Sequence, residues 1–397
     1  MSKPVRVLQA AVAFALLSGC ATPQSTALSS TSSAPQATPN SERATPQQTP
    51  GAPLAAPRAP IKASVGSSDN RNSFLDANGE LEPDVQAFAL EVAQTREVPL
   101  NYVQDILRRA QYNATVARLM TPAKTRIRRS WITYRDRVVE PIRIKAGVEF
   151  WTQYRSTLDQ TASTYGVPPS IIVAIIGVET IYGRQTGNFL VLDALATLGF
   201  RNPDTARPER SRLFRDQLAD LILLDYQKKI DGTQVKGSFA GAIGLPQFMP
   251  GSLMRYAIDG DNDGQINLLD SAPDAIASVA RFLKLHGWQP GLPVFAPVVL
   301  PANASSLVAG GLKPSYDWAQ LKTEGAALKP GTGPGAWQSS RLGVIDLPDE
   351  PRNLDEYRTG TPNFFAITQY NRSYFYAASV ADLAEALAGR MGYGGPN

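Results

Sequence analysis

The sequence has almost none of the two side chains that most often bind metals or assist a catalytic nucleophile. Cys20 is the only cysteine and His286 the only histidine among 397 residues. A single cysteine cannot form a disulfide within the chain, and a single histidine beside Gly287 is typical of the end of a helix. We therefore expect no Ser–His or Cys–His catalytic pair and no histidine-ligated zinc site.

The apolar stretch near the N-terminus is too short to span a bilayer as a stable helix. It covers residues 7–17 and follows two basic residues, an order that is typical of an export signal over residues 1–19. Leu17-Ser18-Gly19-Cys20 resembles the bacterial lipobox, in which the cysteine is acylated and becomes the first residue of the mature protein. By that resemblance Cys20 carries lipid, and Ala21 after it favours the outer membrane over the inner one. The alternative is a free cysteine at the end of an ordinary signal peptide.

Large apolar side chains are scarce from Cys20 to about residue 73, where Ala, Thr, Ser, Pro and Gln dominate. Such a composition cannot bury enough surface to offset the entropy of ordering. We expect residues 20–73 to be a disordered tether, and roughly fifty flexible residues have an r.m.s. span of about 40 Å. A folded region at 74–397 would thus range outward from its lipid anchor.

The charge is weakly basic, with a net charge of +4. The stretch from Lys124 to Arg137 is rich in basic residues, a pattern that nucleic-acid-binding proteins also show. Because an export signal argues against nucleic acid as a partner, we expect none. We interpret the stretch as a solvated face or as a region that attracts an anionic polymer.

Helical periodicity dominates the first part of the folded region, which is long enough for one large or two small domains. Pro168 and Pro169 should end one helix and start the next. The expected helices cover residues 83–96, 100–111, 144–165, 169–182, 190–198, 211–228, 272–285 and 374–387. Between 290 and 355 the pattern changes to Pro, Gly and short apolar runs, which indicates a small β-containing insert.

One carboxylate directly follows an apolar run. Glu179 comes after residues 171–178 and falls in the last turn of the helix expected at 169–182. Burial among apolar side chains and the helix macrodipole both raise the pKa of a carboxyl at that end. A carboxyl that holds its proton near neutral pH can act as a general acid. The alternative is a glutamate at the solvated end of a core helix.

Residues 259–270 form an acidic loop with the sequence DGDNDGQINLLD. Its oxygen ligands at positions one, three, five, nine and twelve, with glycine at six and an apolar residue at eight, match an EF-hand calcium loop. The residues expected to bind one structural Ca²⁺ are Asp259, Asp261, Asp263, Gln265 through its backbone carbonyl, Asn267 and Asp270. Asp270 stands where a sensor loop has Glu, so we expect modest affinity. The alternative is an acidic turn without metal.

Gly and Ala crowd the segment from Ser238 to Pro250, SFAGAIGLPQFMP. Small residues let a backbone approach a ligand closely, while Gln247 can hydrogen-bond and Phe248 can offer apolar surface to a sugar. A helix-packing segment rich in small residues would look similar, so this segment alone leaves both interpretations open.

Together these segments resemble the lytic murein transglycosylase B family. The matching segments are 166–184, 192–198, 240–250, 259–270 and 367–371. By that resemblance the fold class is mainly α (α+β), with an additional α domain at 74–165, a lysozyme-like α-rich catalytic core at 166–290, a small β insert at 291–360 and a return to the core at 361–397. The resemblance also implies a periplasmic enzyme, anchored to the outer membrane, that acts on the glycan strands of peptidoglycan. We expect a monomer without an organic cofactor.

The resemblance also implies roles for individual residues. Glu179 would be the catalytic acid/base, which protonates the bond between N-acetylmuramic acid and N-acetylglucosamine and then takes a proton from the C6 hydroxyl, leaving a 1,6-anhydro end. The residues implied to line the cleft are Tyr134, Ser238, Gln247, Phe248, Met249, Tyr370, Asn371 and Tyr376. Ile243 and Arg281 depart from the family pattern, in which Met and a cleft-facing Tyr are expected.

Two other functions stay open from the sequence. A hydrolytic muramidase would need a second carboxylate, and the nearest one, Asp193, is better explained as a cap at the start of a helix. A non-catalytic, calcium-stabilised glycan-binding lipoprotein would keep the aromatic cleft without any need for a buried acid.

Overall fold

The computed structural model describes residues 72–123 and 125–393. The predicted signal peptide, the lipidation site Cys20 and the tether up to residue 71 lie outside the described residues. Near the start of the described residues, Ser73 pairs with Gln111 in an isolated β-bridge.

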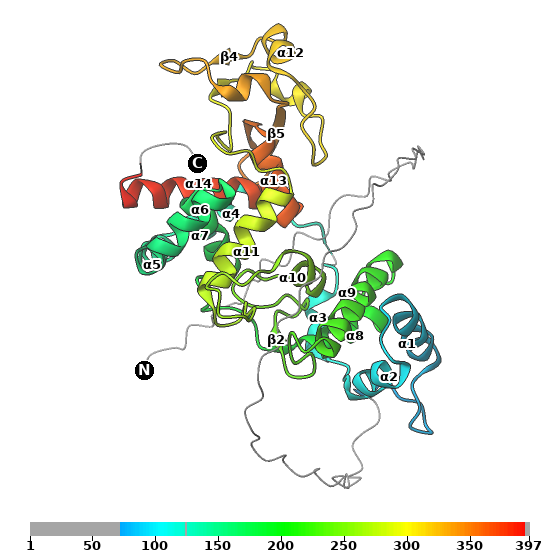
Figure 1. Ribbon diagram of the computed structural model, residues 1–397. Coiled ribbons are helices and arrows are strands. Elements are labelled where there is room, and N and C mark those ends of the chain that lie inside the picture. The colour runs from blue at the N-terminus through cyan, green and yellow to red at the C-terminus, as the bar shows by residue number, and fades with distance from the viewer. Residues whose placement is uncertain (1–71, 124, 394–397) are drawn as a thin grey trace, which may run out of the picture. The chain divides into compact units, whose positions relative to one another are not determined.

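Helices make up most of the described residues, which confirms the mainly α fold class (Figure 1). They are α1 Pro83–Thr95, α2 Leu100–Arg109, α3 Ala114–Met120, α4 Trp131–Val138, α5 Pro141–Gln153, α6 Arg155–Tyr165, α7 Pro169–Thr180, α8 Val191–Phe200, α9 Pro208–Tyr226, α10 Pro250–Tyr256, α11 Ala272–Leu285, α12 Trp318–Thr323, α13 Pro362–Tyr370 and α14 Tyr374–Met391. The strands form antiparallel pairs: β1 Phe189–Leu190 with β2 Lys236–Gly237, β3 Val298–Val299 with β4 Ala327–Leu328, and β5 Gly343–Asp349 with β6 Leu354–Gly360.

Two helix predictions need correction. The single helix expected at 144–165 is two helices, α5 and α6, because the backbone of Tyr154 leaves the helical region at φ −106°, ψ 24°. Its ring packs on Phe150, with ring centroids 4.8 Å apart. The helix expected to reach residue 182 ends at Thr180, since Ile181 and Tyr182 adopt left-handed conformations.

Helix α7 is the centre of the core. Its residues from Ser170 to Val178 are at most 2% exposed. Helices α5, α6, α11 and α14 pack around it, so the sequence buries a nearly continuous apolar run on all sides. Among the described residues no single helix is long and apolar enough to cross a membrane, and α6 with α7 would meet that criterion only as a pair bent by 113°.

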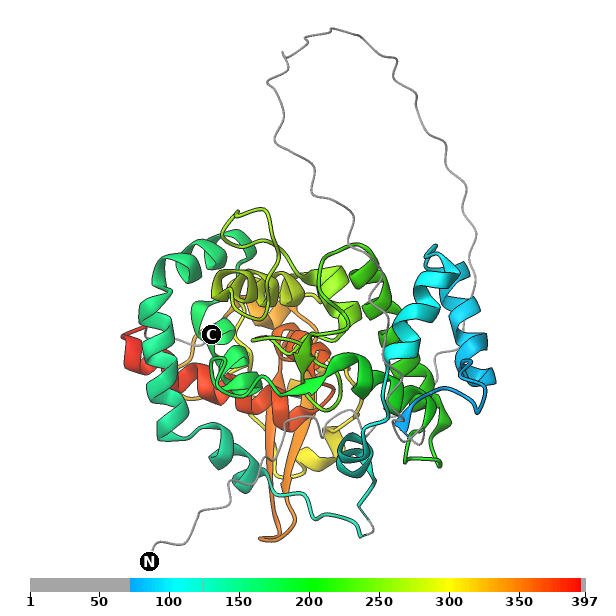
Figure 2. The same cartoon turned by 90° about the horizontal axis from the view of Figure 1, so that it is seen from below.

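The predicted insert has a small core of its own, built around Trp318 and Trp337, whose ring centroids are 5.2 Å apart. Its other buried members are Leu292, Ala296, Val298, Leu307, Leu321, Ala326, Leu342 and Val344. Figure 2 shows the β5–β6 hairpin of this region as two long orange strands. A separate core supports an insert near 291–360, although the domain boundaries stay predictions.

The basic stretch near residue 130 is tied to acidic partners. Arg126 and Arg129 both form ion pairs with Glu350 at the tip of the β5–β6 hairpin, at 2.6 and 3.1 Å. Arg135 pairs at 2.6 Å with Asp382 of α14, which is 8% exposed. These arginines thus hold the hairpin and α14 beside α4, while Arg126 and Arg129 stay exposed to solvent, as a solvated face requires.

Candidate active site

Glu179 lies in the last turn of α7, where α14 packs against it (Figure 1). The hydroxyl of Tyr376, from the first turn of α14, donates a hydrogen bond of 2.6 Å to Glu179 Oε1. Tyr376 has no exposed surface, and its own ring stacks parallel to Tyr370 with centroids 6.3 Å apart. The carboxyl is therefore held from one side by the buried Tyr376, which in turn stacks on the partly exposed Tyr370.

Glu179 is half-buried, and the loss of hydration dominates its electrostatics. This loss raises the pKa of the carboxyl to about 7, against a smaller lowering by the hydrogen bond from Tyr376. Burial likewise raises the pKa of Tyr134 to about 12, with a further contribution from Glu179. The pKa values of Tyr370 and Tyr376 lie well above the usual range for the same two reasons. Near neutral pH the carboxyl of Glu179 can therefore gain or lose a proton, while the surrounding tyrosine hydroxyls keep theirs.

A carboxyl with a raised pKa makes stability depend on pH. Between the ordinary pKa of 4.5 and about 7 the folded state keeps a proton that the unfolded state releases. Rising pH through this window therefore favours unfolding, and above it the cost to the folded state is about 3 kcal/mol. Glu179→Gln, which is neutral at every pH, should exceed the unmodified protein in free energy of unfolding by up to that amount at pH 8 and by little at pH 4. Guanidinium unfolding at both pH values measures the gap, and a gap that does not change with pH would contradict the raised pKa.

The segment 238–250 contacts the residue after Glu179, since Thr180 Oγ1 donates a hydrogen bond of 3.0 Å to Leu245 O. Gln247 donates its side-chain amide to Thr186 O and Gly244 O, at 3.1 and 3.0 Å. Ser238 Oγ accepts from Ala242 N at 3.0 Å. Both side chains are partly exposed, as is Met249. The segment is thus folded as a loop with partly exposed polar groups rather than as a helix-packing stretch.

Phe248 does not face solvent. It is 2% exposed and packs against Tyr370, Tyr256 and Phe282. This position corrects the expectation that Phe248 offers its face to a sugar, because the ring is buried in contact with the ring of Tyr370. Tyr370 is partly exposed and donates a hydrogen bond of 2.6 Å to Pro246 O.

Asn371 and Tyr134 complete the set of predicted cleft residues, and both are partly exposed. Asn371 follows α13, and its Oδ1 is buried without a hydrogen-bond partner in the described chain. An acceptor in that state is a candidate for a ligand donor. Tyr134 comes from α4, and the nearby charge of Glu179 contributes to its raised pKa.

Asp193 does not cap its helix, contrary to the prediction. It lies in the first turn of α8, after the cap position Leu190, and its Oδ1 accepts a hydrogen bond of 2.8 Å from Gln111 N.

The side chains at the two positions that depart from the family pattern both make contacts within the fold. Ile243 is 1% exposed in the core, and Arg281 donates to Ala257 O at 3.3 Å.

Three of the predicted calcium ligands come together. One carboxylate oxygen from each of Asp259, Asp261 and Asp263 lies within 4.8 Å of the other two, and Asp270 is not part of this group. Asn267 Oδ1 instead accepts from the backbone N–H groups of residues 269 and 270. A cluster of carboxylate oxygens is a donor set suited to a hard divalent cation such as Ca²⁺.

Asp274 holds the acidic loop closed, a role that the sequence did not reveal. It is 1% exposed, and its two oxygens accept from Gly260 N at 2.8 Å and from Asn267 N at 2.6 Å. Beyond the loop, Leu268 O accepts from Leu245 N at 2.8 Å, and Leu245 O accepts from Thr180 Oγ1 at 3.0 Å. The acidic loop is thereby linked through one residue to the end of α7.

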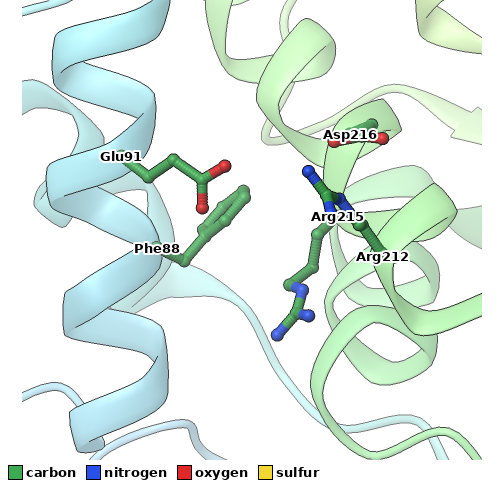
Figure 3. Close-up of a pocket in the computed structure, with 5 residues that line it drawn as sticks. All are labelled: Phe88, Glu91, Arg212, Arg215 and Asp216. Carbon is green, nitrogen blue, oxygen red and sulfur yellow. The ribbon is translucent and has the colours of Figure 1, made fainter. Parts of the chain in front are cut away.

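A separate cavity of about 320 Å³ lies between α1 and α9. Figure 3 shows Phe88 and Glu91 of α1 facing Arg212 and Arg215 of α9 across it, with Asp216 beside them. It shares no residue with the surroundings of Glu179. The half-buried carboxyl of Glu179, rather than this surface cavity, therefore defines the candidate active site.

Comparison with known proteins agrees with this site. The model of the family described as transglycosylase SLT domain matches residues 80–385. The chain is 37% identical over 314 residues to membrane-bound lytic murein transglycosylase B of Escherichia coli (strain K12), which covers 77% of this chain and 83% of that protein.

Solved structures give the same result. Soluble lytic transglycosylase SltB1 from Pseudomonas aeruginosa has a TM-score of 0.69 at 35% identity, over 78% of this chain and all of that one. Escherichia coli lytic transglycosylase Slt35 in complex with calcium has a TM-score of 0.67 at 35% identity, over 81% of this chain and 97% of that one. With its mainly α fold, a family model that spans most of its length and a relative of 37% identity, the chain belongs to the lytic transglycosylases of the transglycosylase SLT domain family.

Proposed function

We propose that Glu179 is the acid/base with which this lytic transglycosylase cleaves the β-1,4 bond between N-acetylmuramic acid and N-acetylglucosamine in peptidoglycan. One observation carries the proposal: the half-buried Glu179 has a pKa raised to about 7 by desolvation, and its hydrogen-bond partner is a neutral phenol. No second carboxyl of the described chain contributes to that pKa. The arrangement suits one group that gives and then takes a proton.

Glu179 alone can supply both proton transfers of the proposed reaction. Protonated Glu179 donates to the glycosidic oxygen as the bond to the muramyl C1 breaks and positive charge develops there. The muramyl 2-acetamido group stabilises this centre. Glu179, now ionised, accepts the proton of the C6 hydroxyl as that oxygen bonds to C1, which gives a 1,6-anhydro end. An attached hydroxyl has a high effective molarity and so outcompetes water.

The cleft is proposed to use partly exposed side chains of the predicted set, five of them polar and one the apolar Met249. Those available for contacts to the glycan are Tyr134, Ser238, Gln247, Met249, Tyr370 and Asn371. Tyr376 has no exposed surface and instead orients Glu179, while Phe248 supports Tyr370. The test of the whole proposal is the chemical form of the released ends, which should be anhydromuramic acid in mass spectra of muropeptides from purified sacculi.

Calcium is proposed to bind the acidic loop. The convergence of Asp259, Asp261 and Asp263 supports this, as does the similarity to a transglycosylase solved with calcium. The ion would neutralise three carboxylates that otherwise repel one another and would stabilise the loop. Asn267, Asp270 and the carbonyl of Gln265 are proposed as further ligands, which requires that Asp270 and Asn267 turn toward the three aspartates.

Replacing Asp261 and Asp263 together with Asn should remove this calcium dependence. Metal that binds only the folded state stabilises it, so calcium at about 100 times its Kd should raise the Tm of the unmodified protein by about 5 °C and leave the variant unchanged. Differential scanning calorimetry with calcium and with a chelator measures both. Asp105→Asn with Asp136→Asn, two exposed aspartates outside the loop, is the matched control. A Tm of the unmodified protein that ignores calcium and chelator would refute the site.

The protein is further proposed to be a periplasmic lipoprotein anchored at the outer membrane through Cys20, in line with its similarity to a membrane-bound relative. Cys20→Ser should leave the chain without lipid, either uncleaved or free in the periplasm, because one anchor supplies its whole membrane affinity. Labelling of cells with radioactive palmitate, followed by cell fractionation, measures both lipid incorporation and location. Lipid incorporation and outer-membrane fractionation of the variant would exclude Cys20 as the anchor.

A further inference from the structure

The turn that follows Glu179 has an uncommon backbone. Ile181, Tyr182 and Gly183 have φ values of 50°, 58° and 88°, which places three consecutive residues in the left-handed region. Glycine adopts this region readily, whereas a β-branched residue such as isoleucine is an outlier there. A backbone of this kind persists only where surrounding contacts hold it.

Hydrogen bonds hold the start of the turn. Thr180 has no exposed surface, and its Oγ1 accepts from Gly183 N at 3.0 Å. The guanidinium of Arg143, which is 8% exposed, donates from Nε to Gly177 O at 3.0 Å. The same carbonyl accepts the N–H of Ile181 at 3.1 Å. The last turn of α7 is therefore fixed at its backbone just where Glu179 projects.

The side chain of Tyr182 holds the remainder of this turn. It folds back between α5 and α7, where a methyl group added at Gly147 or at Gly177 would overlap its hydroxyl oxygen. Its ring lies 5.3 Å from that of Phe150 on α5. Both glycines are inside helices, where glycine is unfavourable, and the close approach of Tyr182 explains each of them.

The hydroxyl of Tyr182 is itself left unsatisfied. It is buried and has no hydrogen-bond partner in the described chain. The sequence thus accepts an unpaired hydroxyl, a left-handed isoleucine and two helical glycines within the same small region. Such departures from local preference concentrate at functional sites, because an ordinary helix end would avoid all of them.

We propose that Tyr182 is a positioning residue, which wedges between Gly147 and Gly177 and so holds the left-handed turn that directs the Glu179 carboxyl toward Tyr376 and the substrate. Glu179 precedes Tyr182 by three residues, so displacement of the ring moves the turn to which the carboxyl is attached. The inference rests on the proposed role of Glu179, which Glu179→Gln tests independently.

Gly147→Ala tests the wedge, because the new methyl group displaces the Tyr182 hydroxyl. We expect kcat on sacculi to fall by about tenfold or more at nearly unchanged KM, since a displacement of about 1 Å at a catalytic group can cost up to about a hundredfold. The pH at which kcat/KM has fallen by half should also shift, because the surroundings of Glu179 change. Loss of folded protein alone would lower kcat equally at every pH.

Rescue separates positioning from general damage. Tyr182→Phe added to Gly147→Ala removes the overlapping oxygen and leaves the ring Cζ 3.0 Å and the flexible Leu387 Cδ2 2.6 Å from the new methyl, so most of the lost kcat should return. In Gly177→Ala the same addition leaves Cζ at 2.6 Å, and kcat should stay low.

The control is Gly389→Ala in α14, where an added methyl group has nothing within 4 Å and kcat should not change. Each kcat is referred to the folded fraction from thermal unfolding. An unchanged kcat in folded Gly147→Ala overturns the proposal. So does a loss that Tyr182→Phe does not restore and that leaves the pH profile unmoved.

Discussion

Glu179→Gln should lower the turnover of purified sacculi by at least about a hundredfold, the usual scale of general acid catalysis. Glutamine keeps the shape of the side chain and can still accept the hydrogen bond from Tyr376, but it cannot give up or take a proton. Because the core of α7 is unaltered, the variant should fold normally. The loss would then belong to chemistry, and binding of glycan strands should persist.

Asp193→Asn is the matched control for this experiment. Its Oδ1 accepts from Gln111 N, and asparagine keeps an oxygen at that position, so turnover should stay close to that of the unmodified protein. If Glu179→Gln retained near-normal turnover, Glu179 would not be the acid. If Asp193→Asn were as inactive as Glu179→Gln, a second carboxylate would have to enter the mechanism.

Glu179 could be predicted from the sequence because its signal is local. An unbroken apolar run dictates a helix buried on all sides, and a carboxyl at its end must lose hydration. The contact with Tyr376 has no local signal, since 197 residues separate the two. Only the family resemblance placed them in one site. Their pairing depends on how α14 packs against α7, which the sequence pattern leaves open.

The turn after Glu179 could not be predicted for a different reason. Nothing in Ile181 or Tyr182 favours a left-handed backbone, so periodicity extends the helix two residues too far. The break at Tyr154 also has no local signal, because no proline or glycine marks it. At the turn after Glu179, by contrast, the tertiary contacts of Tyr182 with Phe150 and with Gly147 override local preference.

The acidic loop shows the same division. Its ligand spacing was readable as a motif, and three of its aspartates do converge. Asp274 lies four residues beyond the motif and has no place in it, yet its buried carboxylate receives the backbone N–H groups of Gly260 and Asn267. The position of such a residue follows from the folded path of the loop, so no fixed sequence interval predicts it.

The products distinguish a transglycosylase from a hydrolase and from a binding protein. If the C6 hydroxyl is the acceptor, muropeptides released from sacculi should end in anhydromuramic acid and be one water lighter than the products of a hydrolytic muramidase on the same sacculi. Liquid chromatography with mass spectrometry resolves the two forms. The hydrolase digest serves as the reference for both mass and label.

Oxygen-18 water makes the distinction sharper, because water never attacks the anomeric carbon in the proposed reaction. The new muramyl ends should carry no label, while the ends released by the reference hydrolase carry one labelled oxygen. The expectation follows from the site: Glu179 is half-buried and no second carboxyl contributes to its raised pKa, whereas a hydrolase needs a base or nucleophile beside its acid. Labelled reducing ends would show that water is the acceptor and would direct attention to Asp193 or another carboxylate. Binding of sacculi by folded protein without any released muropeptide would instead favour a glycan-binding role, and the raised pKa of Glu179 would then report burial alone.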